Sequence, residues 1–496
     1  MNKALLYRAM RVAGAFAAAV VMLWFGSGLH PQWWLTWLAP LPLLWLATRL
    51  SAWRSFVLTV LAVLVSGLSQ WHYANDLIHL PGTVLLLIGV QPAVILAVAV
   101  ALWRRLLLRG APLLAALGYS GVLVAADFDA LRFSANSNWG SLAYTQMDFL
   151  PVLQTAALAG TAGLVFLVSF VPAALAATAW GKVTPRHRLA LAGGTLALLL
   201  AVIGWGAWRL SAPVALEVKV GLIASDLGQN LSPKDPEKMK ALFEGYSAKA
   251  AELIAQGAQL VIVPEKIARV HDERVGDLDL PFEQAAARGA VIAVGVERWS
   301  GADRLNESRI YDAKGALWTT YEKHHMMPVY ESDLKVGTGR TVLDQPLGTA
   351  GGKWGVQICK DMDFPALSRE YGNDGVGLVV VSAWDFIADG WLHDRMAVMR
   401  GVESGFSLAR AAKQGLLTLS DDRGRVLAQQ LTGGEDFSTL LGSVPVHHDD
   451  TLYARWGDWF SWLMLAVLAV TVAVAVAPLA KRRGGSRERA PDPIAL

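Results

Sequence analysis

The sequence has little charge and a single cysteine. Of its 496 residues only 17% are charged, whereas an ordinary soluble protein has about 25%. Its 44 basic and 41 acidic residues leave a net charge of +3, which is too small to indicate a nucleic-acid partner. Because Cys359 is the only cysteine, an intramolecular disulfide is excluded, and so is any zinc or iron–sulfur site built from several cysteines.

Hydrophobic residues, in contrast, make up 54% of the chain, and the mean hydropathy is +0.38. This composition excludes a disordered chain, a coiled coil and a single soluble domain. It indicates a membrane protein, so the position of the apolar residues along the chain becomes the next question.

Charge is absent from long stretches of the first 211 residues. No Asp, Glu, Lys or Arg lies between Arg11 and Arg49, and this run is too long for one helix, since a span takes roughly 20 residues. The turn-forming segment 26–31 divides the run into two predicted helices. Further apolar runs lie at 55–73, 81–103, 111–127, 151–179, 189–208 and 459–480. The sequence therefore predicts a membrane α-helical bundle of about eight transmembrane helices. The first run is not interpreted as a cleaved signal peptide, because further spans follow it and it lacks a convincing cleavage site.

Basic residues gather in alternate loops between the predicted helices. The positive-inside rule makes these loops cytoplasmic. Both termini are then expected in the cytoplasm, and the segment between the last two helices is expected outside it. The basic residues are Lys3, Arg8, Arg11, Arg49, Arg54, Arg104, Arg105, Arg109, Lys182, Arg186, Arg188, Lys481, Arg482 and Arg483.

The segment before the last predicted helix has an ordinary charge content and short apolar runs punctuated by Gly and Pro. Strands are predicted at 218–223, 260–264, 290–295, 354–359 and 376–382, and an amphipathic helix at 236–256. Short buried strands alternating with helices indicate an α/β sandwich. The predicted organisation is a transmembrane bundle at 1–211, an extracytoplasmic domain at 212–456, a C-terminal transmembrane helix at 457–481 and a basic cytoplasmic tail at 482–496.

Three reactive residues stand out in the extracytoplasmic domain. Glu265 follows the apolar strand Val261 to Pro264, Lys323 lies in the segment 321–331, and Cys359 follows another apolar strand. Strand ends are where α/β folds place their sites. Two of them have a plainer interpretation when taken alone: Glu265 as a solvated glutamate, and Cys359 as a small buried thiol. The adjacent His324 and His325 lack the spacing of a zinc site, so no metal is predicted.

Taken together in this order, Glu265, Lys323 and Cys359 resemble the carbon–nitrogen hydrolase (nitrilase) superfamily. The resemblance implies a nitrilase-like αββα sandwich in which Cys359 is the nucleophile. Glu265 would accept the thiol proton, and Lys323 would stabilise the oxyanion, as the chemistry of a thiol nucleophile requires. It further implies supporting roles for Glu331, as a second carboxylate, and for the backbone N–H of Lys360, as a second oxyanion donor.

The membrane helices around this domain resemble one family in particular, the apolipoprotein N-acyltransferases of the bacterial inner membrane. The resemblance is carried by Tyr321 to Glu331, by Tyr453 to Trp459, by Asn138 to Gln146, and by Ala39-Pro40 with its neighbouring tryptophans. It covers nearly the whole chain.

That resemblance implies transfer of an acyl chain from a phospholipid to Cys359 as a thioester. The chain then passes to the N-terminal amine of the diacylglyceryl-cysteine of an apolipoprotein. The implied partners are this phospholipid donor, the apolipoprotein acceptor and the bilayer; no metal or organic cofactor is implied, and the protein is expected to be a monomer with a periplasmic catalytic domain. Candidate substrate-binding residues are Trp139, Tyr144, Trp384 and Trp391, although interfacial anchoring would also explain the tryptophans.

Some positions depart from the family pattern. Lys360 and Asp361 stand where the family usually has tyrosine and glutamate, and Lys266 stands where it usually has a small hydroxyl residue. Two alternatives therefore stay open: a membrane-anchored nitrilase-like amidase or hydrolase, and a paralogous N-acyltransferase with another amine acceptor. The presence of all three reactive residues disfavours a catalytically silent lipid-binding scaffold. A transporter is disfavoured because no charged residue lies near the centre of a predicted span.

Overall fold

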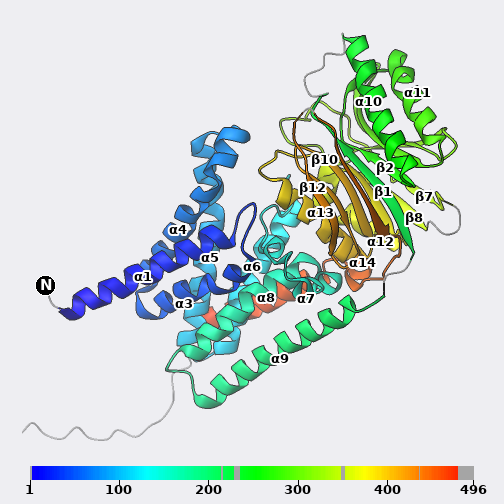
Figure 1. Ribbon diagram of the computed structural model, residues 1–496. Helices are drawn as coiled ribbons and strands as arrows, with labels where there is room; N and C mark the ends of the chain where they lie inside the picture. Colours follow the sequence, from blue (N-terminus) through cyan, green and yellow to red (C-terminus); the bar gives the residue numbers. More distant parts are fainter. Residues whose placement is uncertain (1–2, 214–215, 228–234, 348–351, 435, 479–496) are drawn as a thin grey trace, which may run out of the picture.

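The computed structural model describes residues 3–213, 216–227, 235–347, 352–434 and 436–478, and it has a helical part and a part built on two β-sheets (Figure 1). The predicted basic tail at 482–496 lies outside the described residues. The helical part contains α1 (Lys3–Gly26), α2 (Trp33–Leu38), α3 (Pro40–Arg49), α4 (Ala52–Gly67), η1 (Leu68–Gln70), η2 (His72–Leu77), α5 (Gly82–Leu108), α6 (Pro112–Phe133), η3 (Leu142–Gln146), α7 (Leu150–Leu153), α8 (Ala156–Ala179), α9 (Pro185–Leu210) and α15 (Trp459–Val476).

Within the described residues, seven helices are long and apolar enough to cross a membrane. They correspond to every predicted span except the second, which the structure divides into α2 and α3. The division falls at Pro40, the first residue of α3. Proline has no amide hydrogen to continue the helical ladder, so hydropathy alone predicts one long helix where the backbone forms two short ones.

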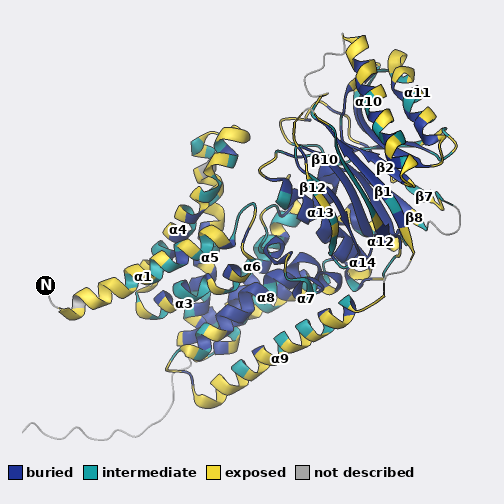
Figure 2. Ribbon diagram, viewed as in Figure 1, coloured by how far each residue is buried: buried dark blue, intermediate teal, exposed yellow. Residues whose placement is uncertain are grey.

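Helix α8 forms the centre of the bundle and packs against α3, α6, α9 and α15. Figure 2 shows it almost wholly buried, whereas α1 and α9 are largely exposed. Gly160 of α8 has φ 61°, and a Cβ at this position would lie 2.4 Å from the ring of Tyr453. A glycine is therefore required where the segment leading to the last span crosses α8.

The second part is a sandwich of two sheets between two layers of helices, which confirms the predicted fold class. Its elements are β1 (Glu217–Ala224), α10 (Pro236–Ala255), β2 (Leu260–Val263), β3 (Arg269–His271), η4 (Asp272–Arg274), α11 (Val275–Ala286), β4 (Val291–Ser300), β5 (Asp303–Tyr311), β6 (Leu317–Glu322), β7 (Val342–Asp344), β8 (Lys353–Ile358), η5 (Cys359–Asp363), α12 (Pro365–Asn373), β9 (Leu378–Trp384), α13 (Gly390–Ser404), β10 (Ser407–Lys413), β11 (Leu416–Ser420), β12 (Val426–Leu431), β13 (Ser438–Pro445) and α14 (Leu452–Trp456).

One sheet has the strand order β13-β1-β2-β4-β5-β6, with β3 pairing to β4, and the other has the order β12-β11-β10-β9-β8-β7. Side chains of a strand alternate between its two faces. In β2, Leu260 and Ile262 accordingly join the core between the sheets, whereas Val261 and Val263 join the core beneath α10 and α11. Continuous apolar runs are thus expected, since both faces of these strands are covered.

The two sheets meet at the ends of β2 and β9. The Ser382 hydroxyl donates to the carbonyl of Val263 at 2.8 Å, and the Glu265 N–H donates to the carbonyl of Ala383 at 3.3 Å. Strand β8 is parallel to β9, so the residue that follows β8, Cys359, lies at the same end of the sandwich. This end is where the predicted reactive residues gather.

Side-chain contacts join the sandwich to the helical part. The Tyr73 hydroxyl of η2 donates to Asp389 at 2.7 Å, and Arg400 of α13 donates to the Tyr144 hydroxyl at 3.1 Å. The Arg209 guanidinium at the end of α9 lies 2.8 Å from Asp449.

Candidate active site

A buried lysine between two glutamates forms the core of the site. The Lys323 ammonium, just after β6, lies 2.8 Å from Glu265 Oε1 and 2.7 Å from Glu331 Oε2. Each of the three side chains is only about 2% exposed. A buried cation needs partners of opposite charge, and the two carboxylates supply them from the end of β2 and from the loop after β6.

Two further residues hold the carboxylates in place. Asn306 of β5 donates from one amide nitrogen to Glu265 Oε1 at 2.6 Å and to Glu331 Oε1 at 2.8 Å. Lys266, directly after Glu265, contacts Glu331 Oε1 at 2.5 Å. The arrangement therefore alternates Lys266, Glu331, Lys323 and Glu265, with Asn306 bridging the two acids.

Cys359 lies at the turn from β8 into η5. Its backbone has φ 43°, a left-handed conformation that is uncommon for residues other than glycine and is often found at functional sites. The thiol donates to the carbonyl oxygen of Trp384 at 3.4 Å. The nucleophile candidate is thus held between the ends of β8 and β9, with 7% of the residue exposed.

The electrostatics of the site keep the lysine charged and the thiol protonated. Burial would lower the pKa of Lys323, but the charges of Glu265 and Glu331 outweigh burial and raise it well above its usual value. For Glu331, burial would raise the pKa, but Lys323 and Lys266 lower it to about 2. Burial raises the pKa of the Cys359 thiol, as does the charge of Glu265, and Lys323 opposes both. A resting thiol in this site needs a neighbouring base to take its proton.

Asp361 joins the lysine segment to the cysteine turn. Its fully buried carboxylate accepts hydrogen bonds from the Tyr321 hydroxyl at 2.7 Å, from the Ile358 N–H at 3.2 Å, and from the backbone N–H groups of His324 and His325 at 3.1 and 2.8 Å. Two of these donors flank Lys323, and Ile358 precedes Cys359. The carboxylate therefore fixes the position of the lysine relative to the nucleophile. His325 also stacks on Phe364, with ring centroids 3.9 Å apart.

Lys360 points toward the helical part of the protein. Its ammonium lies 3.0 Å from Asn136 Oδ1, in the loop after α6, and 3.3 Å from Asp363. The predicted role of Lys360 concerns its backbone N–H, and its side chain serves a separate contact between the two parts of the chain.

A second charged cluster borders the cysteine. His393 lies 3.2 Å from Asp385 and 3.6 Å from Asp363, and Arg410 contacts Asp385 through two nitrogens, at 2.9 and 2.6 Å. Burial would lower the pKa of His393, but Asp363 and Asp385 raise it to about 10. His393 is therefore an imidazolium at neutral pH. Within this cluster, the charge of Asp385 raises the pKa of the thiol and the charge of Arg410 lowers it.

The predicted substrate-binding residues occupy different positions. Trp384 has its carbonyl against the thiol and its ring 3.6 Å from the Lys413 ammonium. The ring of Trp139 meets His393 at 4.7 Å, and that of Trp391 meets His30 of the helical part at 4.7 Å.

Tyr144 is 1% exposed and is held by Asn138 and Arg400. The three tryptophans thus border the cysteine or the junction with the helices, whereas Tyr144 is enclosed within that junction.

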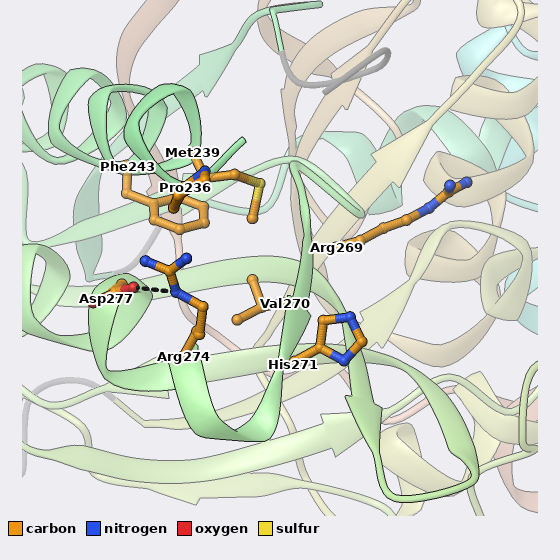
Figure 3. Close-up of a pocket in the computed structure, with 8 residues that line it drawn as sticks. All are labelled: Pro236, Met239, Phe243, Arg269, Val270, His271, Arg274 and Asp277. Atoms are coloured by element: carbon orange, nitrogen blue, oxygen red, sulfur yellow. Dashed lines mark hydrogen bonds and ion pairs between the residues drawn. The ribbon is translucent and has the colours of Figure 1, made fainter. Parts of the chain in front are cut away.

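A small cavity lies elsewhere in the sandwich, between α10 and β3 (Figure 3). Phe243 and Arg274 converge on it, and Arg274 is paired with Asp277 at 3.0 Å. Its volume of about 20 Å³ has room for little more than one water molecule. None of the reactive residues lines it, so it is not part of the candidate active site.

Asn306, Asp361 and His393 were not selected as site residues from the sequence. Asn306 and His393 lie within polar stretches that are also typical of solvent-facing elements, and Asp361 stood out only as a departure from the family pattern. No strand is predicted at 303–311, so the sequence gives no signal for Asn306.

Two known families match separate segments of the chain. The Apolipoprotein N-acyltransferase N-terminal domain matches residues 13–174, and the Carbon-nitrogen hydrolase family matches residues 227–436. The first segment covers most of the helical part, and the second includes all four of Glu265, Lys323, Glu331 and Cys359.

Two relatives resemble the chain across both parts. The chain is 30% identical over 368 residues to the apolipoprotein N-acyltransferase of Gloeobacter violaceus, covering 70% of this chain and 69% of that protein. It is 29% identical over 380 residues to that of Geobacter metallireducens, covering 68% and 70%. Among solved structures, an amidase from Nesterenkonia sp. matches 51% of this chain and 99% of its own, with 20% identity and a TM-score of 0.41.

Proposed function

The chain belongs to the apolipoprotein N-acyltransferase family, and from that premise we propose that it moves an acyl chain from a phospholipid to the N-terminal amine of an apolipoprotein. Family membership supports N-acyltransferase activity and a membrane location. The single observation that carries the proposed mechanism is the buried Lys323 paired with Glu265 and Glu331 beside the Cys359 thiol. These groups are those that acyl transfer through a thiol needs.

In the first step, the Cys359 sulfur attacks the ester carbonyl carbon of the phospholipid while its proton passes to the Glu265 carboxylate. The Lys323 ammonium and the Lys360 N–H stabilise the negative charge that develops on the carbonyl oxygen. When the intermediate collapses, the ester C–O bond breaks and the lysophospholipid oxygen takes the proton from Glu265. The enzyme keeps the acyl chain as a thioester.

In the second step, the neutral α-amine of a diacylglyceryl-cysteine attacks the thioester carbon, and Glu265 accepts a proton from the nitrogen. The C–S bond then breaks, an amide forms, and the proton returns from Glu265 to the sulfur. Glu331 and Asn306 touch neither substrate in this scheme; they hold Glu265 and Lys323 in position. All steps use side chains and backbone groups of the protein itself.

The proposal includes a location and an orientation. Both termini lie in the cytoplasm, and the sandwich lies on the periplasmic side of the bacterial inner membrane, because the basic loops mark the cytoplasmic side. Contacts such as that of Lys360 with Asn136 support a site that opens toward the helices, through which two lipid substrates arrive. The working unit is a monomer.

Intact mass spectrometry of the detergent-purified protein after incubation with phospholipid tests the first step. We expect a mass increase of one acyl chain that hydroxylamine removes and that Cys359→Ala abolishes. A diacylated lipopeptide should then discharge the adduct and gain the acyl chain as an amide. If water alone discharges the adduct at the same rate, the protein is a hydrolase; if no adduct forms and no lipopeptide is acylated, phospholipid is not the donor.

A further inference from the structure

A large groove lies in the helical part, at the end away from the sandwich. It has a volume of about 740 Å³ and lies between α1, α3 and α8. This volume falls within the roughly 300–1,000 Å³ typical of ligand sites. His30, after α1, contacts Trp391 of the sandwich, so the opposite end of α1, with Arg11, lies on the far side of the bundle (Figure 1).

The groove is lined mainly by apolar side chains and by two arginines. Met22, Leu41 and Leu175 are among the apolar lining residues; Arg11 lies within the first half of α1, and Arg49 is the last residue of α3. Arg49 stacks over the ring of Trp45, 5.3 Å from its centroid. The groove therefore combines an apolar surface with two cations among its lining residues.

Neighbouring arginines at this end are engaged by backbone carbonyls, but these two are not. Arg104 donates to the carbonyl of Ala47 at 2.7 Å, and Arg109 donates to that of Ala477 at 2.8 Å; both cap helix ends. Within the described residues, the side chains of Arg11 and Arg49 form no hydrogen bond or ion pair. Two guanidinium groups that line an apolar groove and have no acidic partner fit a phosphate carried on acyl chains, since guanidinium groups bind phosphate well.

We infer that this groove binds an anionic phospholipid of the leaflet away from the sandwich, as a site separate from the acyl-transfer reaction. The phosphate contacts Arg11 and Arg49, and an acyl chain lies along the groove. Basic pockets between transmembrane helices are known to bind anionic head groups. The inference depends only on the two arginines and the groove, so it is independent of the proposed acyl-transfer reaction. With the orientation proposed above, this leaflet is the cytoplasmic one.

Native mass spectrometry of the full-length protein tests the inference, with dioleoyl phosphatidylglycerol and dioleoyl phosphatidylcholine as probes. The two lipids share their acyl chains, and only the first has a net negative charge. We expect preferential binding of phosphatidylglycerol and no competition from free glycerol phosphate. Each basic side chain strengthens binding to anionic lipid by roughly fivefold, so Arg11→Gln with Arg49→Gln should weaken it by about 30-fold.

Two further variants separate the groove from general charge. Arg186→Gln removes an exposed juxtamembrane arginine that does not line the groove, and it should leave binding unchanged. A Cβ at Gly14 would meet no other atom within 4 Å, so the side chain added by Gly14→Leu starts in open space at a residue that lines the groove. It should reduce the binding of phosphatidylglycerol.

Equal binding of the two lipids by the native protein would overturn the inference, as would full binding by the double arginine variant or by Gly14→Leu. A dimer that Gly14→Leu dissociates would assign the groove to a second copy of the chain and also overturn it. The comparison of lipids on the native protein holds even if a variant fails to fold.

Discussion

Replacing Asp361 with asparagine should both weaken the sandwich and slow acyl transfer. One Asp361 oxygen accepts from the N–H groups of His324 and His325, and the other accepts from the Tyr321 hydroxyl and the Ile358 N–H. Asparagine has only one acceptor oxygen. In its better orientation that oxygen keeps the histidine N–H groups, the Tyr321 hydroxyl rotates to accept, and the Ile358 N–H loses its partner.

An unpaired buried donor costs about 1–3 kcal/mol, and a hydrogen bond to a charged group contributes about 1.5–3 kcal/mol. We therefore expect Asp361→Asn to destabilise the sandwich by about 2–4 kcal/mol. For a domain of this size the change corresponds to roughly 5–15 °C in melting temperature. Because Ile358 precedes the nucleophile, the rate of thioester formation should fall while the affinity for phospholipid changes little.

The assay is thermal unfolding of the detergent-purified protein, followed by the rate of adduct formation at saturating phospholipid. Asp277→Asn is the matched control, since Asp277 pairs with Arg274 on the surface with both side chains nearly half exposed; such a pair contributes about 0–1 kcal/mol. Tyr321→Phe removes one donor and leaves the charge, and it should fall between the two. If Asp361→Asn melts with the control and forms the thioester at the native rate, the positioning role assigned to this carboxylate is wrong.

Three further predictions follow from the site and the bundle. Alkylation of Cys359 by iodoacetamide should be slow at pH 8 and accelerate only in more alkaline solution, and Glu265→Gln should lower the pKa of the thiol and speed labelling; an equally slow variant would contradict the electrostatics described. His393 has a folded-state pKa near 10, above its unfolded value of about 6.5. Its contribution to stability is therefore full below pH 6.5 and is lost as the pH rises toward 10. His393→Gln should flatten the fall in melting temperature across this range, and an unchanged pH profile would refute the assigned charge of His393. Gly160→Ala places a Cβ 2.4 Å from the Tyr453 ring and should lower the melting temperature by several degrees. Adding Tyr453→Leu should partly restore it. If the melting temperature is unchanged in both variants, the steric argument is wrong.

The sequence predicts five strands of the sandwich, which correspond to β1, β2, β4, β8 and β9, because these strands are continuous apolar runs. The predicted strand at 260–264 and helix at 236–256 agree with β2 and α10 to within one residue. Glu265 and Cys359 are predicted at the ends of two such runs, but β2 and β8 belong to different sheets. The contact between the ends of β2 and β9 that brings the two residues to one end of the sandwich cannot be predicted from the sequence. The division of the second predicted span was missed because hydropathy does not register the missing N–H of Pro40.

The residues that hold the site together were less accessible to sequence reasoning. Asn306 reaches both glutamates only because β5 pairs with β4 on one side and β6 on the other, and this register depends on contacts distant in sequence. Lys413 donates to the carbonyl of Lys266 at 2.9 Å across 147 positions of the chain, and burial lowers its pKa to about 7. Such contacts arise from the tertiary fold, and no local sequence pattern predicts them.

The chain enters and leaves the sandwich along one edge. Strand β1 follows α9, β13 precedes α14 and the last span, and the two strands are antiparallel neighbours, with Glu217 opposite Pro445. Both covalent connections to the helical part therefore lie on one side of the sandwich. Away from that side, the sandwich is held to the helices by hydrogen bonds such as those of Tyr73 with Asp389 and of Lys360 with Asn136. Because these contacts are hydrogen bonds, the sandwich and the helical part can separate at them, whereas the two covalent connections keep the two parts joined along one side.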